Sequence, residues 1–190
     1  MVKQAVLAHP VHEEHRHPGM NQVGLWLFFL SEAFLFACLA SGRFYIAGVD
    51  RPEHLNQGLG LVITSILLLS SYCAYRAESA FVHGNREQSM NYLLGTIVLG
   101  LVFVAGVSIE WSTAEFSISE PYGTAFFTMT GIHATHVLSG IVILGLVLRL
   151  ARRGHFSQES HWGIEASIKY WHFVDVVWVF FYPILYLVSW

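Results

Sequence analysis

The sequence predicts an all-α membrane protein with five transmembrane helices in one antiparallel bundle. Hydrophobic residues occupy 54% of its 190 positions and charged residues only 12%, which is about half of the charged share of a soluble domain. Charged side chains divide the chain into five apolar runs of 21 to 28 residues, each long enough to cross a bilayer as a helix. The expected spans are residues 22–46, 55–76, 89–111, 123–150 and 169–190.

The connections between these spans are short, so consecutive helices are expected to pack antiparallel. No internal repeat is visible, and we expect residues 20–190 to form one transmembrane domain behind a polar tail, residues 1–19. The composition excludes a nucleic-acid-binding protein, because 10 Lys and Arg against 13 Asp and Glu leave no basic face for phosphates.

The basic residues predict the orientation in the membrane. Eight of the ten Lys and Arg residues lie in the tail and in the second and fourth connections, whereas Arg43 and Arg51 lie on the opposite side. The positive-inside rule therefore places the N-terminus in the cytoplasm and the C-terminus on the outer side of the membrane. No removable signal peptide is visible. Six aromatic residues near span ends are expected at headgroup depth: Trp26, Tyr45, Tyr75, Trp111, Trp171 and Trp190.

The polar tail is rich in histidine, at positions His9, His12, His15 and His17. Such a cluster suggests metal binding, but no cysteine or fixed helix sets a ligand geometry, so we favour a solvated segment. The two cysteines, Cys38 and Cys73, lie at different depths of the first two spans and are too far apart for a disulfide. We interpret both as small packing residues.

In the first apolar run, residues 17–42, Glu32 is the one charged residue, and it lies near the middle of the first span. An ionisable group at this depth costs about 3 kcal/mol on insertion scales, so we expect a neutral acid that donates one hydrogen bond. Four interpretations remain open: a proton carrier, a ligand of a lipid headgroup, a contact to another subunit, or a hydrogen bond between helices.

The second and third spans are each followed or closed by a carboxylate. Glu78 follows the second span at the inner face, and Glu110 closes the third span at the outer face, directly before Trp111. We expect each to be a solvated helix end or a tie between helices, and we assign neither of them a reaction.

The fourth span contains His133 and His136, one helical turn apart near its centre. Three small residues recur every fourth position on the same helix and would allow close approach of a neighbour: Gly131, Thr135 and Ser139. Two histidines on one helix cannot straddle a haem, and a shared metal would need a third ligand from elsewhere. We therefore favour hydrogen-bonded structural histidines over haem or copper ligands.

The last span carries a polar ribbon on an otherwise apolar helix, formed by His172, Asp175, Val179, Tyr182 and Tyr186. His172 and Asp175 are spaced to pair directly at i,i+3. Such a pair could relay protons or clamp the bundle, and a clamp is the favoured interpretation. Pro183 is expected to kink the outer half of this helix.

Two of these segments resemble a known family. Residues 126–137 (FFTMTGIHATHV) and 170–178 (YWHFVDVVW) are similar to the patterns FFxxTGxHGxHV and YWHFVDVVW of subunit III of haem-copper terminal oxidases. Glu32, which follows Ser31, resembles the intramembrane carboxylate of that family. The likeness covers the chain from about Gly19 onward and fits a short form with five helices. Ala134 stands in place of the usual Gly, and Val107 in place of a frequent Gln.

The resemblance implies a non-catalytic core subunit of a respiratory cytochrome c oxidase, without haem, copper or catalytic residues of its own. Reduction of O2 to water and proton pumping would take place in subunit I, the main partner, beside subunit II and small accessory subunits. The chain would stabilise subunit I, bind phospholipid, and assist O2 access and proton uptake. Glu32 would face a lipid cleft, His172 and Asp175 would stabilise the last helix, and His133 and His136 would join the bundle interior.

Other functions remain open. The partner could be a quinol oxidase or a nitric oxide reductase, and the residues do not distinguish cytochrome c from quinol as the electron donor. A small haem-binding protein built from His133, His136 and His172 would show its own haem spectrum. A transporter using Glu32 and Asp175 is disfavoured, because neither repeated halves nor broken helices are visible.

Overall fold

The computed structural model describes residues 18–49, 52, 55–157 and 161–188. These residues form helices and connections only, as the sequence predicts. In chain order, the elements are α1 (Pro18–Ala47), α2 (Gln57–Val82), α3 (Arg86–Thr113), α4 (Pro121–Arg152), α5 (Trp162–Tyr182) and the π-helix η1 (Pro183–Leu187). Five helices are long and apolar enough to cross a membrane, which confirms the predicted number of spans. The His-rich tail lies almost entirely outside the described residues, so its metal-binding or solvated role stays a prediction.

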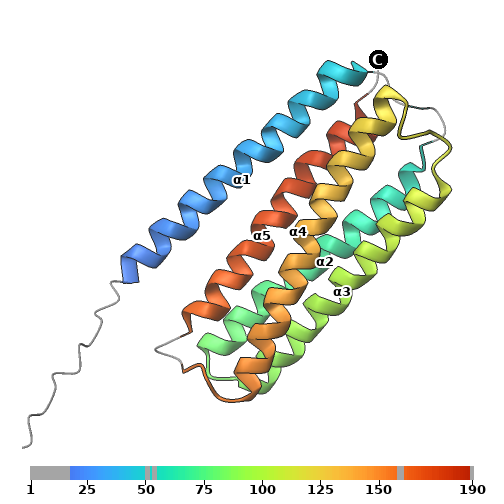
Figure 1. Cartoon of the computed structure of the whole chain (residues 1–190). Helices are drawn as coiled ribbons and strands as arrows, with labels where there is room; N and C mark the ends of the chain where they lie inside the picture. The colour runs from blue at the N-terminus through green and yellow to red at the C-terminus, as the bar shows by residue number, and fades with distance from the viewer. Residues whose placement is uncertain (1–17, 50–51, 53–54, 158–160, 189–190) are drawn as a thin grey trace, which may run out of the picture.

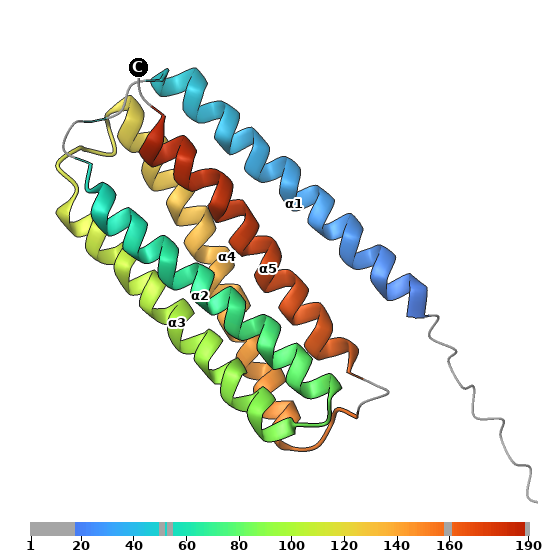
Figure 2. The ribbon, with the colours of Figure 1, turned by 180° about the vertical axis from the view of Figure 1, so that it is seen from behind.

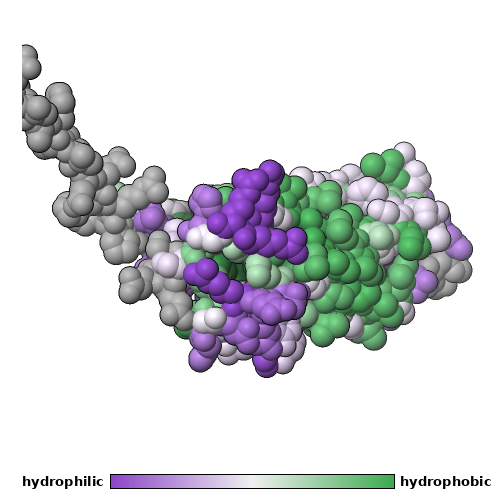
Figure 3. All heavy atoms as spheres, turned by 90° about the horizontal axis from the view of Figure 1, so that it is seen from below, coloured by the Kyte–Doolittle hydropathy of each residue, from purple (hydrophilic) through white to green (hydrophobic). Residues whose placement is uncertain are grey.

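Helices α2, α3, α4 and α5 form a four-helix bundle, and α1 lies along one side of it (Figures 1 and 2). Helix α1 packs against α4 and α5. It is the least buried of the five, since only 11% of its most apolar window lies inside the protein. In Figure 3, hydrophobic atoms form a broad zone across the molecule, and hydrophilic atoms gather beside it. This distribution is the one expected of a protein that crosses a bilayer.

The bundle has two ends, which we name after their connections. The α2–α3 end carries residues 83–85, 153–157 and 161, and the α3–α4 end carries residues 48–49, 52, 55–56 and 114–120. The N-terminus of α1 points toward the first end, and the C-terminus lies at the second (Figure 1). Which end faces the cytoplasm stays a prediction.

Helix α2 continues six residues beyond its predicted span, and α5 begins seven residues before its own. Only residues 83–85 separate α2 from α3; there, Gly84 adopts a φ of 81°, and the Asn85 side chain caps the next helix. In α5, Ile164 and Ile168 are fully buried, and Lys169 bonds Glu165 one turn earlier at 2.5 Å. The i,i+4 ion pair and the buried apolar face therefore extend α5 toward its N-terminus. The charged residues of this segment had instead predicted a connection outside the helix.

The aromatic residues predicted at headgroup depth differ in exposure, and their depth stays a prediction; Trp190 lies outside the described residues. Trp26, Tyr45 and Tyr75 are at least 60% exposed, as rings at headgroup depth should be. Trp171 is only 1% exposed, which corrects the exposure expected of a ring at headgroup depth. Its ring lies between Gly100 of α3 and Gly140 of α4, where an added Cβ would meet ring carbons at 2.6 and 2.9 Å. Two glycines thus make room for one indole in the centre of the bundle.

Indole N–H groups also join the helices. Trp171 donates to Ser70 Oγ at 3.1 Å and Trp178 donates to Thr64 Oγ1 at 3.0 Å, both across the α2–α5 contact. Trp111 of α3 donates to Thr130 Oγ1 of α4 at 3.0 Å. Because apolar packing between helices is not favoured over packing with lipid, such bonds help to select the neighbour of each helix.

Proline and cysteine positions complete the comparison with the sequence. The α-helical geometry changes at Pro183, where α5 passes into the π-helix η1. Both cysteines are free, as predicted. Cys38 is exposed on α1, where it borders a groove against α4, whereas Cys73 is partly buried. Sequence spacing excluded the disulfide but did not show which face of α1 is covered.

Candidate functional site

The intramembrane carboxylate of α1 has a partner on α4. Glu32 Oε2 lies 3.0 Å from His136 Nε2, and these side chains are 20% and 18% exposed. On the other side of the ring, His136 Nδ1 lies 2.9 Å from the carbonyl oxygen of Ile132. A carbonyl can only accept, so Nδ1 carries a hydrogen and Nε2 faces Glu32.

This geometry fixes the number of protons that the pair shares. Either a neutral Glu32 donates to a neutral His136, or a charged His136 donates to the Glu32 carboxylate. Both arrangements hold one proton between Oε2 and Nε2, and both leave the pair without net charge. Of the four interpretations that the sequence left open, the structure displays the hydrogen bond between helices.

The two histidines of α4 lie in different surroundings. His133 is fully buried, with Trp178 and Phe103 ring centroids at 4.7 and 5.7 Å. Neither of its ring nitrogens has a hydrogen-bond partner among the residues that the structure describes. The expectation of two hydrogen-bonded histidines is therefore correct for His136 and wrong for His133, which packs as an aromatic ring.

His172 and Asp175 of α5 do not form the predicted direct pair. His172 Nδ1 instead bonds Ser71 Oγ of α2 at 2.7 Å. Asp175 is 4% exposed; neither of its carboxylate oxygens meets hydrogen-bond geometry with a described residue, although Ser71 also lies near it. Ser71 thus stands between the two ionisable side chains. No pattern in the sequence pointed to this serine, because its role depends on the α2–α5 contact.

The remaining carboxylates differ from each other. Glu110 is 3% exposed and accepts a hydrogen bond from Tyr186 at 2.7 Å, so it ties α3 to η1 and is not a solvated end. Glu78 is half-buried near the end of α2. The sequence predicted either a solvated helix end or a tie between helices for each residue, and Glu110 forms a tie between helices.

Arg43 is buried, which the sequence did not indicate. The count of basic residues assigns it to the outer side of the membrane; in the structure it belongs to α1, near the end of this helix, and is only 1% exposed. Its guanidinium donates to the carbonyl oxygen of Gly48 and lies 5.3 Å from the centre of the Tyr122 ring. Tyr122 in turn donates to the carbonyl oxygen of Leu185 at 2.6 Å. Contacts of α1, α4 and η1 therefore converge at the α3–α4 end.

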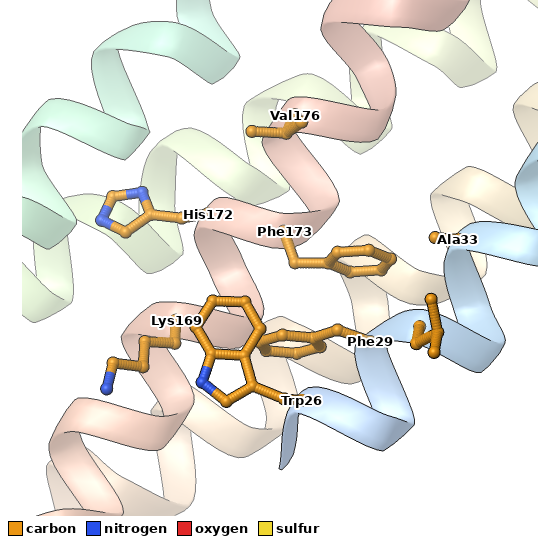
Figure 4. A pocket seen from close by; sticks show the side chains of 8 residues that line it. Trp26, Phe29, Ala33, Lys169, His172, Phe173 and Val176 are labelled. Carbon is orange, nitrogen blue, oxygen red and sulfur yellow. The ribbon is translucent and has the colours of Figure 1, made fainter. Parts of the chain in front are cut away.

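Two apolar grooves flank the first half of α1. The larger, between α1 and α5, has a volume of about 640 Å³ and is shown in Figure 4. In its wall Phe29 and Phe173 stack with ring centroids 4.9 Å apart, while Lys169 and His172 extend from α5. The second groove, of about 410 Å³, lies on the α4 side of α1 and includes Phe28 and Tyr170. Their lining suits an alkyl chain better than a polar substrate.

The described residues contain no group of three or more His, Cys, Asp or Glu side chains that could hold a metal ion. His136 is bonded to Glu32, and His172 to Ser71, so these imidazoles point at different helices. The absence of haem and metal from this chain stays a prediction. What the arrangement does provide is a set of ties between helices: α1 to α4, α2 to α5, and α3 to η1.

Comparison with known proteins identifies related sequences. The family model described as cytochrome c oxidase subunit III matches residues 2–190. Proteins named cytochrome c oxidase subunit 3 are 36% identical in Coturnix japonica and 38% in Ornithorhynchus anatinus, each over 176 residues that cover 86% of this chain and 67% of the relative. The protein of that name from Thermostichus vulcanus is 30% identical over 186 residues, covering 94% of this chain and 92% of the relative.

Proposed function

Since the chain belongs to the cytochrome c oxidase subunit III family, we propose that it is a non-catalytic subunit of a respiratory haem-copper oxidase. In this assembly subunit I carries the haem and copper, reduces O2 to water and pumps protons. This chain contacts subunit I above all, with subunit II and small accessory subunits nearby. It lies in a bacterial plasma membrane, with five antiparallel spans and a cytoplasmic N-terminus.

One observation carries the non-catalytic role. Of the ionisable side chains at membrane depth, Glu32 is bonded to His136, His172 to Ser71, and Glu110 to Tyr186, while His133 and Asp175 are buried inside the bundle. A group that acts on substrate needs to reach that substrate, whereas these groups are either bonded to a neighbouring helix or buried between helices. The pattern supports a scaffold that holds subunit I in its active form.

Lipid binding forms part of the proposal. The two grooves beside α1 are lined mostly by carbon, and Lys169 lies at the edge of the larger one (Figure 4). Phospholipid acyl chains fill such grooves, and Lys169 and Trp26 are suited to headgroup depth. Glu32, one helical turn from Phe28 and Phe29, stabilises the α1 surface that these lipids cover. Lipid held here can also guide O2, which is apolar, toward subunit I.

Purification from native membranes in mild detergent tests the assignment. We expect the chain to migrate with a haem-copper subunit I and the haem absorbance to remain with that partner after the subunits are separated. A chain that migrates alone, or keeps haem after separation, would contradict the proposal. If the partner were a quinol oxidase or a nitric oxide reductase subunit, the scaffold role would hold and the oxidase type would change.

A further inference from the structure

A small chamber lies at the α3–α4 end, between the start of α2 and the end of α3. It encloses about 20 Å³, and its lining residues are Leu55, Asn56, Glu110, Thr113, Ala114 and Phe116. Glu110 reaches it from the last turn of α3 and is 97% buried, being only 3% exposed. Its Oε2 accepts the Tyr186 hydroxyl, whereas Oε1 is buried without a hydrogen-bond partner among the described residues.

The two other polar side chains that line the chamber already form hydrogen bonds elsewhere. The Thr113 hydroxyl donates to the carbonyl oxygens of Ile109 at 3.0 Å and Glu110 at 3.3 Å. The Asn56 side-chain oxygen accepts from the Leu59 N–H at 2.9 Å as the cap of α2. A buried acceptor without a donor costs about 1–3 kcal/mol. The described residues therefore provide no donor to this carboxylate oxygen.

We propose that this chamber binds one water molecule, which donates a hydrogen bond to Glu110 Oε1. A water needs about 10–15 Å³ of such space, so the chamber admits one and excludes larger guests. A divalent cation such as Ca²⁺ would need about six to eight oxygen ligands, whereas half of the lining consists of apolar side chains: Leu55, Ala114 and Phe116.

A water at this position would connect two helix ends. It can donate a second hydrogen bond to the Thr113 hydroxyl oxygen and accept one from the amide group of Asn56. The start of α2 and the last turn of α3 would then be joined through Glu110, which Tyr186 already ties to η1. This inference concerns the chain itself and does not depend on the proposed function.

A density map of the purified native complex, at a resolution that shows ordered water, tests the proposal. We expect one peak about 2.6–3.2 Å from Glu110 Oε1. The variant Glu110→Gln should keep the peak, because the amide has similar volume and both donor and acceptor groups. The variant Glu110→Leu should lose it, because no polar atom remains to hold a water.

Three results would overturn the proposal. The first is a wild-type chamber without a peak. The second is a peak about 2.3–2.6 Å from six or more oxygens, which would identify a cation. The third is a peak that persists in Glu110→Leu, since Glu110 would then not hold the water. If Glu110→Leu fails to fold, the wild-type and Glu110→Gln maps decide the question.

Discussion

At the scale of single residues, membrane depth makes each ionisable side chain informative. Glu32 interrupts an apolar helix at a cost that a hydrogen bond can offset, and the structure supplies His136 as the partner at 3.0 Å. The need for a partner was predictable from the sequence. Its identity was not, because the contact depends on how α1 is rotated against α4.

The Glu32–His136 bond should contribute measurably to stability. In a double-mutant cycle with Glu32→Leu and His136→Leu, we expect a coupling free energy of about 0.6–1.7 kcal/mol, the range measured for hydrogen bonds between membrane helices. Reversible unfolding in detergent measures it. Thr135→Val is the matched control, because Thr135 is exposed and bonds the carbonyl of its own helix. Additive effects of the two substitutions would show that the pair contributes nothing.

Glu32 should also affect the lifetime of the complex more than its initial rate. We expect Glu32→Ala to leave the first phase of O2 reduction largely intact, while retained lipid falls and activity declines sooner, because α1 loses its tie to α4. Lipid quantification and prolonged O2 consumption measure these effects. Immediate loss of activity in an assembled complex with intact haems would instead make Glu32 a direct participant.

At the scale of elements, small residues decide how closely the helices approach. Gly100 and Gly140 both lie against the buried Trp171 indole, which joins α3, α4 and α5 in one place. The recurring small residues on α4 predicted close approach, and Gly131 does lie beside Trp111. The buried position of the Trp171 side chain was not predictable, since its place near a span end suggested the headgroup region.

Gly140→Ala should destabilise the bundle by about 1–3 kcal/mol, because the new methyl group would lie about 2.9 Å from ring carbons that cannot bend away. Gly145→Ala on the same helix is the control, since an added Cβ there meets no atom within 4 Å. Thermal unfolding of the two variants in one detergent makes the comparison. Equal stability of both would contradict the packing described for Trp171.

At the scale of the whole molecule, composition alone predicted the class and the number of spans, because apolar length is a strong constraint in a bilayer. The helix ends at Val82 and Trp162 were missed, since charged side chains can extend a helix beyond the membrane. The contacts of Ser71, Tyr186 and Arg43 were missed for another reason: each joins segments that are distant in sequence. The sequence pattern identifies the ionisable residues, while the packing of the helices determines which groups they contact.

The predicted orientation can be tested on the intact chain. After the native cysteines are replaced by alanine, we expect Ser119→Cys to react with an impermeant maleimide in intact cells, and His155→Cys to react only after lysis. Both positions are exposed, in connections at opposite ends of the bundle. The opposite labelling pattern would place the N-terminus outside the cytoplasm.

The central claim is that this chain supports catalysis without performing it. The most direct measurement is O2 consumption over many turnovers by the purified complex, before and after selective removal of this chain, with the haem content of each sample determined. The account predicts a similar initial rate and unchanged haem, followed by earlier loss of activity in the depleted complex. A depleted complex that retains its haem but shows no initial O2 reduction would contradict it.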